Sequence, residues 1–206
     1  MRYGKLYKVA NVNSKLIDES LSHIDFEEMR RATVADKNAK KPLTNNPSNI
    51  KHEMRTNSVT FIYDKTIRER WLNVAKQVNK DLGWNFELSD IEPLQYGEYA
   101  ETQQYAWHVD QHNQPYEDNN VRKMSFSVFL NDDYTGGEFD LEIHGPTVKG
   151  HRYKTFSKLP INSMLFFQSD YWHRVRPVTN GVRKSMVGWV LGPKFKWKFL
   201  KLMKFT

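Results

Sequence analysis

The sequence predicts an α+β domain with a mainly β core, and the order of its patterns is the main reason. Helical patterns fill the part before Gly83, whereas short β-rich runs separated by Gly, Pro, Asn and Asp follow it. Many short strands with turn signals are typical of a sandwich or barrel. A chain of 206 residues with 39% hydrophobic residues can bury one core but is short for two. We expect a single domain over 1–206, with a helical and loop region at 1–60, a core at 61–193 and a basic aromatic tail at 194–206.

The best-marked helix begins near Thr66 and ends at Gly83. Thr66 and Glu69 have the spacing of a capping box, and Gly83 suits a helix C-terminus. One apolar stripe connects them, formed by Ile67, Trp71, Val74, Val78 and Leu82. A less regular helix is predicted from about 13 to 35, and the polar segment 36–52 is predicted to be an exposed loop.

The strands are predicted from short apolar or alternating runs bounded by turn residues. We expect strands at 85–88, 92–99, 105–109, 123–130, 138–143, 163–168 and 185–191.

The net charge of +7 is unevenly distributed. Residues 143–206 carry thirteen Lys or Arg against one acid, Asp170, a balance of +12, so the first 142 residues carry about −5. A C-terminal half with this positive charge would attract an anionic small molecule or an acidic polymer, or would simply form a solvated cationic surface. For the tail we favour packing of its aromatic side chains onto the body over a membrane-surface or polyanion-binding peptide.

Nothing in the sequence predicts secretion or a membrane span. There is no apolar run of about 18 residues, and no apolar segment follows the basic N-terminus. The chain has no cysteine, which excludes disulfides, thiolate metal sites and cysteine nucleophiles. We expect a cytoplasmic protein.

Three side chains from two distant stretches predict a metal site. His108 and Asp110 are two residues apart, so on a strand they project to the same side. His173 stands in a loop beyond the apolar run 163–168, and antiparallel folding could bring it beside His108. Two imidazoles and one carboxylate form the ligand set of non-haem Fe(II) oxygenases, which keeps positions open for oxygen and a co-substrate.

Arg183 has a natural task beside such a site. A 2-oxo acid that chelates iron through its keto group and one carboxylate needs an anchor for its far carboxylate, and arginine offers a bidentate fork. Ser185, two residues on, would share the face of Arg183 and add a hydroxyl donor. Taken alone, however, Arg183 reads as an ordinary surface arginine in a basic segment.

The other histidines lack a partner at ligand spacing, so we interpret them as surface residues: His23, His52, His112, His144 and His151. The loop of His112 is expected to border the metal site. A zinc hydrolase is disfavoured because no Glu occupies the place of a base in a known zinc motif.

Several ordered motifs resemble those of the 2-oxoglutarate and Fe(II)-dependent dioxygenases, in their prolyl 4-hydroxylase-like branch. The motifs are Leu94-Gln95-Tyr96, Trp107-His108-Val109-Asp110, Phe129-Leu130-Asn131-Asp132, Tyr134-Thr135-Gly136-Gly137-Glu138-Phe139 and the stretch from His173 to Arg183. The resemblance covers about 58–193. It implies a double-stranded β-helix, a jelly roll with helices packed on one side.

The resemblance also implies roles for single residues. His108, Asp110 and His173 would hold Fe(II), and Arg183 would bind the C5 carboxylate of 2-oxoglutarate. Tyr96 would line the co-substrate pocket, and Arg122 and Tyr105 match substrate-facing positions of some relatives. Phe129 replaces a tyrosine that binds the co-substrate in several of them, and the Gly136-Gly137 pair is interpreted as a turn or bulge. The polar segment 111–120 is a candidate lid.

The predicted function is therefore hydroxylation of a C–H bond with O2 and 2-oxoglutarate, releasing succinate and CO2, with ascorbate as a candidate reductant. The favoured substrate is a peptidyl or free amino acid, proline first. Two alternatives stay open: the same chemistry on a nucleic-acid base, suggested by the basic C-terminal half, and a non-catalytic jelly-roll binding module.

Overall fold

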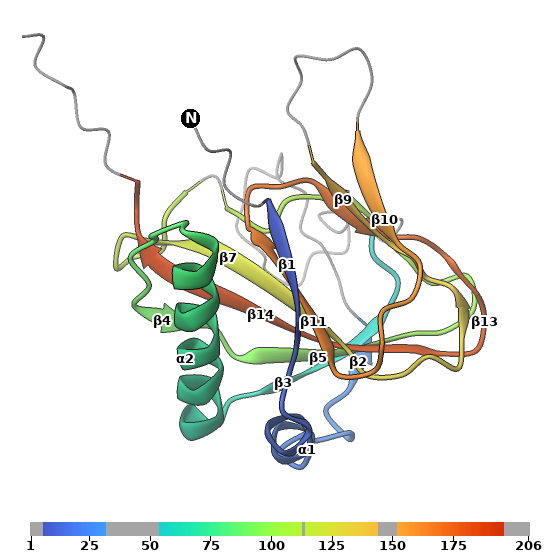
Figure 1. Cartoon of the computed structure of the whole chain (residues 1–206). Helices are drawn as coiled ribbons and strands as arrows, with labels where there is room; N and C mark the ends of the chain where they lie inside the picture. Colours follow the sequence, from blue (N-terminus) through green and yellow to red (C-terminus); the bar gives the residue numbers. More distant parts are fainter. Residues whose placement is uncertain (1–5, 32–53, 113, 144–151, 196–206) are drawn as a thin grey trace, which may run out of the picture.

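Two β-sheets face each other, and both helices pack on the outer side of the larger sheet (Figure 1). The computed structural model describes residues 6–31, 54–112, 114–143 and 152–195. This arrangement is a double-stranded β-helix with packing helices, so the predicted fold class, α+β with a mainly β core, is confirmed. Within the described residues, no helix is long and apolar enough to cross a membrane.

Helix α2, Lys65–Leu82, is the predicted helix with a different N-cap. The Asp64 side chain accepts a hydrogen bond from the Ile67 backbone N–H at 2.8 Å, so Asp64 caps the helix and Thr66 lies inside its first turn. The capping box expected at Thr66 is therefore wrong. Gly83 ends the helix in the left-handed conformation, at φ 68°, as expected. Four residues of the stripe are buried, namely Ile67, Trp71, Val78 and Leu82, and Val74 is partly buried.

Helix α1, Ser14–Leu21, is much shorter than the helix expected at 13–35. A turn follows it, in which the Asp25 carboxylate accepts the backbone N–H groups of Glu27 and Glu28 at 2.9 and 3.4 Å. Such local side-chain bonds compete with helical ones, which explains why the helix does not continue. Residues 32–35 and the loop expected at 36–52 lie outside the described residues.

The larger sheet has the strand order β1-β11-β7-β14-β5-β3-β2, with β4 paired to β14. Its strands are β1 Tyr7–Asn11, β2 Arg30–Arg31, β3 Ser58–Ile62, β4 Asp90–Ile91, β5 Leu94–Tyr99, β7 Asn120–Phe129, β11 Ser163–Gln168 and β14 Arg183–Pro193. The smaller sheet has the order β10-β9-β12-β6, with β6 Tyr105–His108, β9 Phe139–Glu142, β10 Tyr153–Phe156 and β12 His173–Val175. A further pair joins β8 Thr135–Gly136 to β13 Val178–Asn180.

Six of the seven expected strands are present, the one at 163–168 with its expected ends and five with shifted ends, whereas the strand expected at 85–88 is absent. There the Asn79 side chain of α2 accepts the Phe86 backbone N–H at 3.0 Å and donates to the Phe86 carbonyl at 2.9 Å. A helix side chain thus satisfies the backbone groups that a strand would have paired. The sequence patterns did not reveal the remaining strands, namely β1, β2, β3, β4, β8, β10, β12 and β13, and β2 lies within the helix expected at 13–35.

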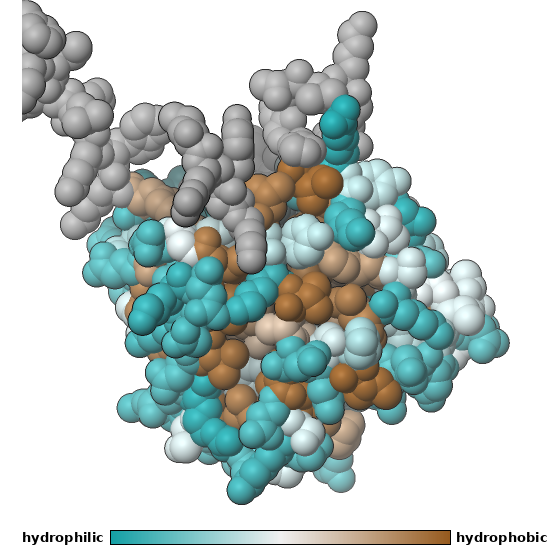
Figure 2. Space-filling view, in the orientation of Figure 1, coloured by the Kyte–Doolittle hydropathy of each residue, from teal (hydrophilic) through white to brown (hydrophobic). Residues whose placement is uncertain are grey.

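The buried hydrophobic residues form two separate cores. One lies between the helices and the large sheet, where Trp71 of α2 stacks on Phe126 of β7 at 5.3 Å between ring centroids. The Trp71 indole N–H also donates to the Ser20 hydroxyl at 2.8 Å, which connects α2 to α1. The second core lies between the two sheets and includes Phe139 and Phe167. On the face drawn in Figure 2, hydrophobic side chains show in the middle among polar ones.

The basic tail is described only at its start. The Phe195 ring lies edge-on to Phe86, with 5.8 Å between centroids, and the Lys123 ammonium lies 3.2 Å from the centroid of the Phe195 ring. Residues 196–206 lie outside the described residues.

One buried carboxylate connects three segments of the small sheet. Asp140 of β9 is fully buried and accepts hydrogen bonds from Arg174 of β12 at 2.7 Å, from Arg176 at 2.8 Å and from the Thr155 hydroxyl of β10 at 2.7 Å. Burial alone would raise the pKa of Asp140, but the hydrogen bonds from Arg176, Thr155 and Arg174 lower it below its usual value.

We therefore expect Asp140→Asn to destabilise the protein by about 2 kcal/mol at pH 7, measured by urea unfolding. The folded-state pKa of Asp140 is lowered, so its contribution is present above the unfolded pKa of about 3.9 and is lost as the pH falls below it. The difference between variant and parent should shrink in the same way. Glu117→Gln, on an exposed residue, is the control; equal losses for both variants, or a loss unchanged by acid, would contradict the assignment.

Candidate metal centre and co-substrate pocket

The two histidines predicted from distant stretches lie side by side. His108 ends β6 and His173 begins β12, and the two residues are register partners in an antiparallel pair. Their ring centroids are 4.0 Å apart. His173 thus belongs to a short strand and not to the expected loop. Next to this pair the register shifts, so that Val175 faces Tyr105; such a bulge lets both Tyr105 and His108 face the interior.

Both imidazoles are held in the same way. His108 Nδ1–H donates to the Ala106 carbonyl at 2.8 Å, and His173 Nδ1–H donates to the Tyr171 carbonyl at 2.9 Å. Each bond fixes the tautomer and directs Nε2 toward the other ligands. Burial, together with the neighbouring His173, lowers the pKa of His108 well below its usual value. The neutral imidazole, the form that binds a metal, is therefore the favoured one.

Asp110 completes the cluster. Its carboxylate lies 3.6 Å from His108 Nε2 and 3.4 Å from His173 Nε2, and the ligand atoms of all three residues are within 4.8 Å of one another. The backbone N–H of Asp110 donates to the Ser169 carbonyl at 3.0 Å, which holds the residue just beyond the end of β6. Burial would raise the pKa of Asp110, but His173, His108 and Arg122 outweigh it and lower the pKa to about 2. Asp110 Oδ2 is nevertheless buried without a hydrogen-bond partner.

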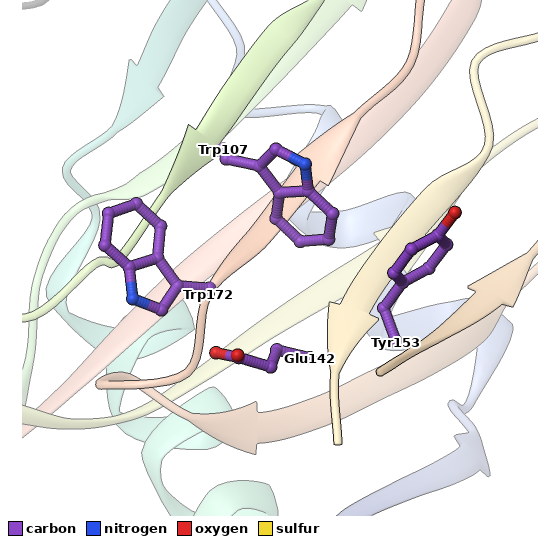
Figure 3. Close-up of a pocket in the computed structure, with 4 residues that line it drawn as sticks. All are labelled: Trp107, Glu142, Tyr153 and Trp172. Carbon is purple, nitrogen blue, oxygen red and sulfur yellow. The ribbon is translucent and has the colours of Figure 1, made fainter. Parts of the chain in front are cut away.

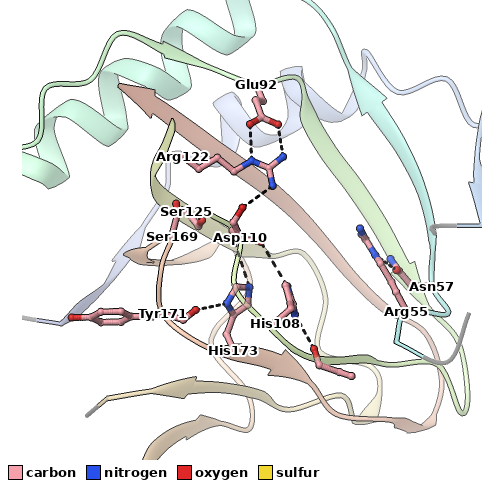
Figure 4. A network of polar contacts seen from close by, with 11 residues as sticks. Arg55, Asn57, Glu92, His108, Asp110, Arg122, Ser125, Ser169, Tyr171 and His173 are labelled. Atoms are coloured by element: carbon pink, nitrogen blue, oxygen red, sulfur yellow. Dashed lines mark hydrogen bonds and ion pairs between the residues drawn. The ribbon is translucent and has the colours of Figure 1, made fainter. Parts of the chain in front are cut away.

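Arg122 lies between Glu92 and Asp110 (Figure 4) and is not among the described residues that line the cavity. It binds Glu92 through Nε at 2.6 Å and Nη2 at 2.5 Å, while its Nη1 donates to the Asp110 backbone carbonyl at 3.2 Å. Its guanidinium also lies 4.1 Å from the Trp189 ring centroid. Glu92 and the Asp110 backbone thus accept three hydrogen bonds from Arg122, and its expected contact with substrate stays a prediction.

Arg183 lies in the same cavity as the three ligands. It is 1% exposed, and its Nη1 donates to the Ser185 hydroxyl at 3.1 Å, so both residues share a face of β14 as predicted. Its Nε and Nη2 are buried without a hydrogen-bond partner. The guanidinium is 5.2 and 5.5 Å from the ring centroids of Phe129 and Tyr99. A buried guanidinium with two unused donors is costly unless an anion completes it.

Tyr96 points away from this cavity. Tyr96 lies on β5 and is the register partner of Met186 on β14, a residue of the core beneath the helices. Its hydroxyl donates to Glu98 at 2.7 Å, and its ring packs against Phe26. From β5, Gln95 and Tyr99 line the cavity instead. The expected role of Tyr96 is thus wrong, because alternation along β5 gives the cavity to its neighbours of the other parity.

Tyr105 does line the cavity, with its ring stacked on His108 at 3.5 Å between centroids. Burial raises the pKa of its hydroxyl to about 12. Arg55, which the sequence patterns did not reveal, also lines the cavity and lies 4.6 Å from the Tyr105 ring centroid. The sequence patterns did not reveal it because a stretch without periodicity, 36–52, precedes it; in the structure an isolated bridge to Tyr105 and a hydrogen bond from its Nε to the Asn57 side chain at 2.8 Å hold it in place.

The Gly136-Gly137 pair forms the interpreted turn, with φ of +72° and +63°. A Cβ on Gly136 would lie 2.5 Å from the Pro177 carbonyl oxygen, and one on Gly137 would lie 3.0 Å from Arg183 Cδ. The second glycine therefore gives the Arg183 side chain its room.

Among the other histidines, His23 and His112 are exposed, as expected, whereas His52, His144 and His151 lie outside the described residues. The ring of His112 lies 5.6 Å from that of Tyr116 in the segment 111–120. The Tyr116 hydroxyl donates to Glu92 at 2.7 Å, which connects this segment to the Arg122 network.

Comparison with known proteins gives three kinds of similarity. Residues 94–191 match the family model of the 2OG-Fe(II) oxygenase superfamily. A PKHD-type hydroxylase of Synechococcus sp. (strain CC9902) is 34% identical over 88 residues, covering 42% of this chain and 35% of that protein. A PKHD-type hydroxylase of Hyphomonas neptunium is 40% identical over 90 residues, covering 42% and 37%. The chain thus spans little more than a third of the length of these relatives.

Solved structures share the fold at low identity. A Pseudomonas putida prolyl-4-hydroxylase has a TM-score of 0.60 and 16% identity, covering 90% of this chain and 91% of that chain. The viral collagen prolyl hydroxylase of Paramecium bursaria Chlorella virus-1 has a TM-score of 0.58 and 16% identity, covering 92% and 97%.

The cluster predicts a simple experiment on Asp110. Asp110→Ala should weaken Mn(II) binding, measured by electron paramagnetic resonance, by at least about 100-fold, because one of three ligands is lost. The metal-free variant should unfold at a temperature no lower than that of the metal-free parent, since the parent buries an unpartnered carboxylate oxygen. Asp132→Ala, on an exposed residue, is the control. Unchanged Mn(II) affinity, or a much lower melting temperature, would contradict this assignment.

Proposed function

We propose, starting from the match of residues 94–191 to the family model of the 2OG-Fe(II) oxygenase superfamily, that the protein belongs to this superfamily and is an Fe(II)- and 2-oxoglutarate-dependent hydroxylase of the prolyl 4-hydroxylase type. One observation carries the proposal. A buried cluster of two imidazoles and a carboxylate shares its cavity with a buried guanidinium that has two unused donors.

The donor set fits ferrous iron. Two neutral imidazole nitrogens and one carboxylate oxygen are the facial triad of non-haem Fe(II) oxygenases, which keeps positions open for other ligands. The unpartnered Asp110 Oδ2 would be satisfied by a cation at the centre of the cluster. No cysteine is available to favour a softer metal.

The pocket also fits 2-oxoglutarate. Arg183 would bind the far carboxylate through the two donors that have no partner in the protein, and Ser185 would hold the guanidinium in place and add a hydroxyl. The rings of Phe129 and Tyr99 keep this end of the cavity apolar, so the ion pair would form away from water. Since Phe129 lacks a hydroxyl, Tyr99 would be the tyrosine beside the far carboxylate of 2-oxoglutarate.

The bound iron with 2-oxoglutarate and O2 supplies the oxidising chemistry, in which 2-oxoglutarate becomes succinate and CO2 while a substrate C–H bond is hydroxylated. The protein orients the reactants. The Nδ1 bonds of His108 and His173 direct their Nε2 atoms, and Arg122 holds the Asp110 backbone. Tyr105 and Arg55 border the cavity beside His108 and are the candidate contacts for substrate. Ascorbate would serve as external reductant.

For the substrate we favour a prolyl residue in a polypeptide, ahead of a free amino acid. The PKHD-type relatives are named as hydroxylases, and the solved structures that share the fold are named as prolyl hydroxylases, which supports this choice. The alternative substrate, a nucleic-acid base, rests only on the charge of the C-terminal half and on the aromatic residues interleaved with it. A binding module without catalysis would have no use for the unpaired donors of Arg183.

Arg183 can be tested without a known substrate. With Mn(II) bound, Arg183→Met should lower the affinity for 2-oxoglutarate, measured by calorimetry, by about 100-fold, the size expected for a lost charge-assisted pair. Ser185→Ala should have a smaller effect, and Tyr96→Phe, on the opposite face of β5, should have none. An unchanged affinity in Arg183→Met would refute the proposed anchor.

Turnover is the direct test of the function. The Fe(II) protein should release succinate from 2-oxoglutarate only in the presence of oxygen, and proline-containing peptides should raise the rate and gain 16 Da by mass spectrometry, the increment of one oxygen atom. His108→Ala should abolish succinate release while the protein stays folded. If anaerobic samples with Fe(II) bind no 2-oxoglutarate, the function is wrong.

A further inference from the structure

A second pocket lies next to the metal cluster and has no part in the chemistry proposed above. It has a volume of about 510 Å³ and is lined by Trp107, Glu142, Tyr153 and Trp172 (Figure 3). Among the described residues, three aromatic rings and one carboxylate line this space, which is large enough for a side chain of a bound ligand.

Two residues of this pocket are sequence neighbours of two residues of the metal cluster. Trp107 directly precedes His108, and Trp172 directly precedes His173. Within β6, neighbouring side chains point to opposite faces, so the Trp107 indole lies outside the small sheet while the His108 imidazole lies inside. Trp172, directly before β12, lines the same pocket as Trp107. The backbone N–H of Glu142 donates to the Trp172 carbonyl at 2.8 Å, and Glu142 pairs with Tyr153 across β9 and β10. A substrate that reaches the cluster could thus place a neighbouring group here.

The pocket residues remain accessible although they are large and apolar. Trp172 is 48% exposed and Tyr153 is 42% exposed. Aromatic side chains that stay exposed around a hollow mark binding surfaces more often than isolated exposed residues do.

The chemistry of the walls favours a cation. Indole and phenol rings present negative faces that attract ammonium and guanidinium groups, and the Glu142 carboxylate, which points toward Trp172 in Figure 3, only accepts hydrogen bonds. The molecule already uses these rings in this way: the Arg174 guanidinium lies 4.8 Å from the Trp107 ring centroid and 5.9 Å from that of Tyr153.

The two arginines beside the rings are paired with a carboxylate. Arg174 and Arg176 both bind Asp140, at 2.7 and 2.8 Å. Asp140 therefore offsets part of their charge, and Glu142 adds a second carboxylate at the pocket wall. An anionic group would instead have to approach the Glu142 carboxylate.

We propose that this pocket binds a cationic side chain, lysine or arginine, of the substrate polypeptide beside the residue that is oxidised. The part about the substrate rests on the proposed function, whereas cation binding by the pocket does not. The pocket would then select which residues are modified, by holding the cation between Trp107 and Trp172 while the neighbouring residue enters the cavity of the metal cluster.

The test uses the full chain without metal or 2-oxoglutarate, so that its failure is distinct from a failure of catalysis. Two probes of nearly equal shape, choline and its uncharged isostere 3,3-dimethylbutan-1-ol, are titrated while tryptophan fluorescence and indole N–H resonances are followed. Choline should bind at least about 10-fold more tightly, the ratio expected for a cation on aromatic faces. Nα-acetyl-lysine methylamide should likewise bind more tightly than its norleucine counterpart.

Variants locate the effect. Trp172→Leu should abolish choline binding, and Glu142→Gln, which keeps the shape but removes the charge, should weaken it several-fold. Tyr63→Leu, on a tyrosine that is 62% exposed and does not line the pocket, is the control. Circular dichroism and the melting temperature check that each variant folds. If Trp172→Leu does not fold, the test relies on Glu142→Gln.

Three results would overturn the proposal. Equal binding of choline and its isostere would mean an apolar slot without charge selection. Choline binding that survives Trp172→Leu would place the site elsewhere. If choline does not bind but a thymidine oligonucleotide does, and Trp172→Leu abolishes that binding, the pocket is a base-stacking site for single-stranded nucleic acid.

Discussion

The register between β6 and β12 is the constraint on which the rest of the site depends. It places His108 opposite His173, and the bulge beside this pair turns Tyr105 inward together with His108. Both imidazoles then donate through Nδ1 to a carbonyl two residues earlier, so their Nε2 atoms meet at Asp110. A slip of one residue in this pairing would turn one imidazole to the outside of the small sheet and remove the cluster.

Buried charge is handled differently on the two sides of the small sheet. Asp140 is satisfied by two arginines and a threonine, as expected of a carboxylate that supports structure. Asp110 and Arg183 instead keep buried atoms without partners. Native structures rarely tolerate such atoms unless a ligand completes them, and this contrast separates structural from functional charge in the molecule.

The large sheet serves two purposes through the alternation of its strands. One face of β5 and β14 carries Leu94 and Met186 into the core under the helices, and the other carries Tyr99 and Arg183 into the cavity. Helix α2 and its stacked Trp71 therefore hold rigid the strands that present the pocket. On the small sheet, side-chain alternation likewise places the metal ligands on the inner face and the aromatic pocket on the outer face.

Much of this could be predicted from the sequence because it depends on local patterns. The stripe of α2, its end at Gly83, six strands, and the candidate ligands at His108, Asp110 and His173 all follow from spacing and residue type, as does the shared face of Arg183 and Ser185. Tertiary structure decided what depends on partners from elsewhere in the chain. Asn79 removed the strand at 85–88, Glu92 bound the guanidinium of Arg122, and the pairing of β5 with β14 turned Tyr96 toward the helices. The periodicity of a segment indicates which residues share a face, but which face meets the core and which meets the cavity is set by the strands it pairs with, and these are distant in sequence.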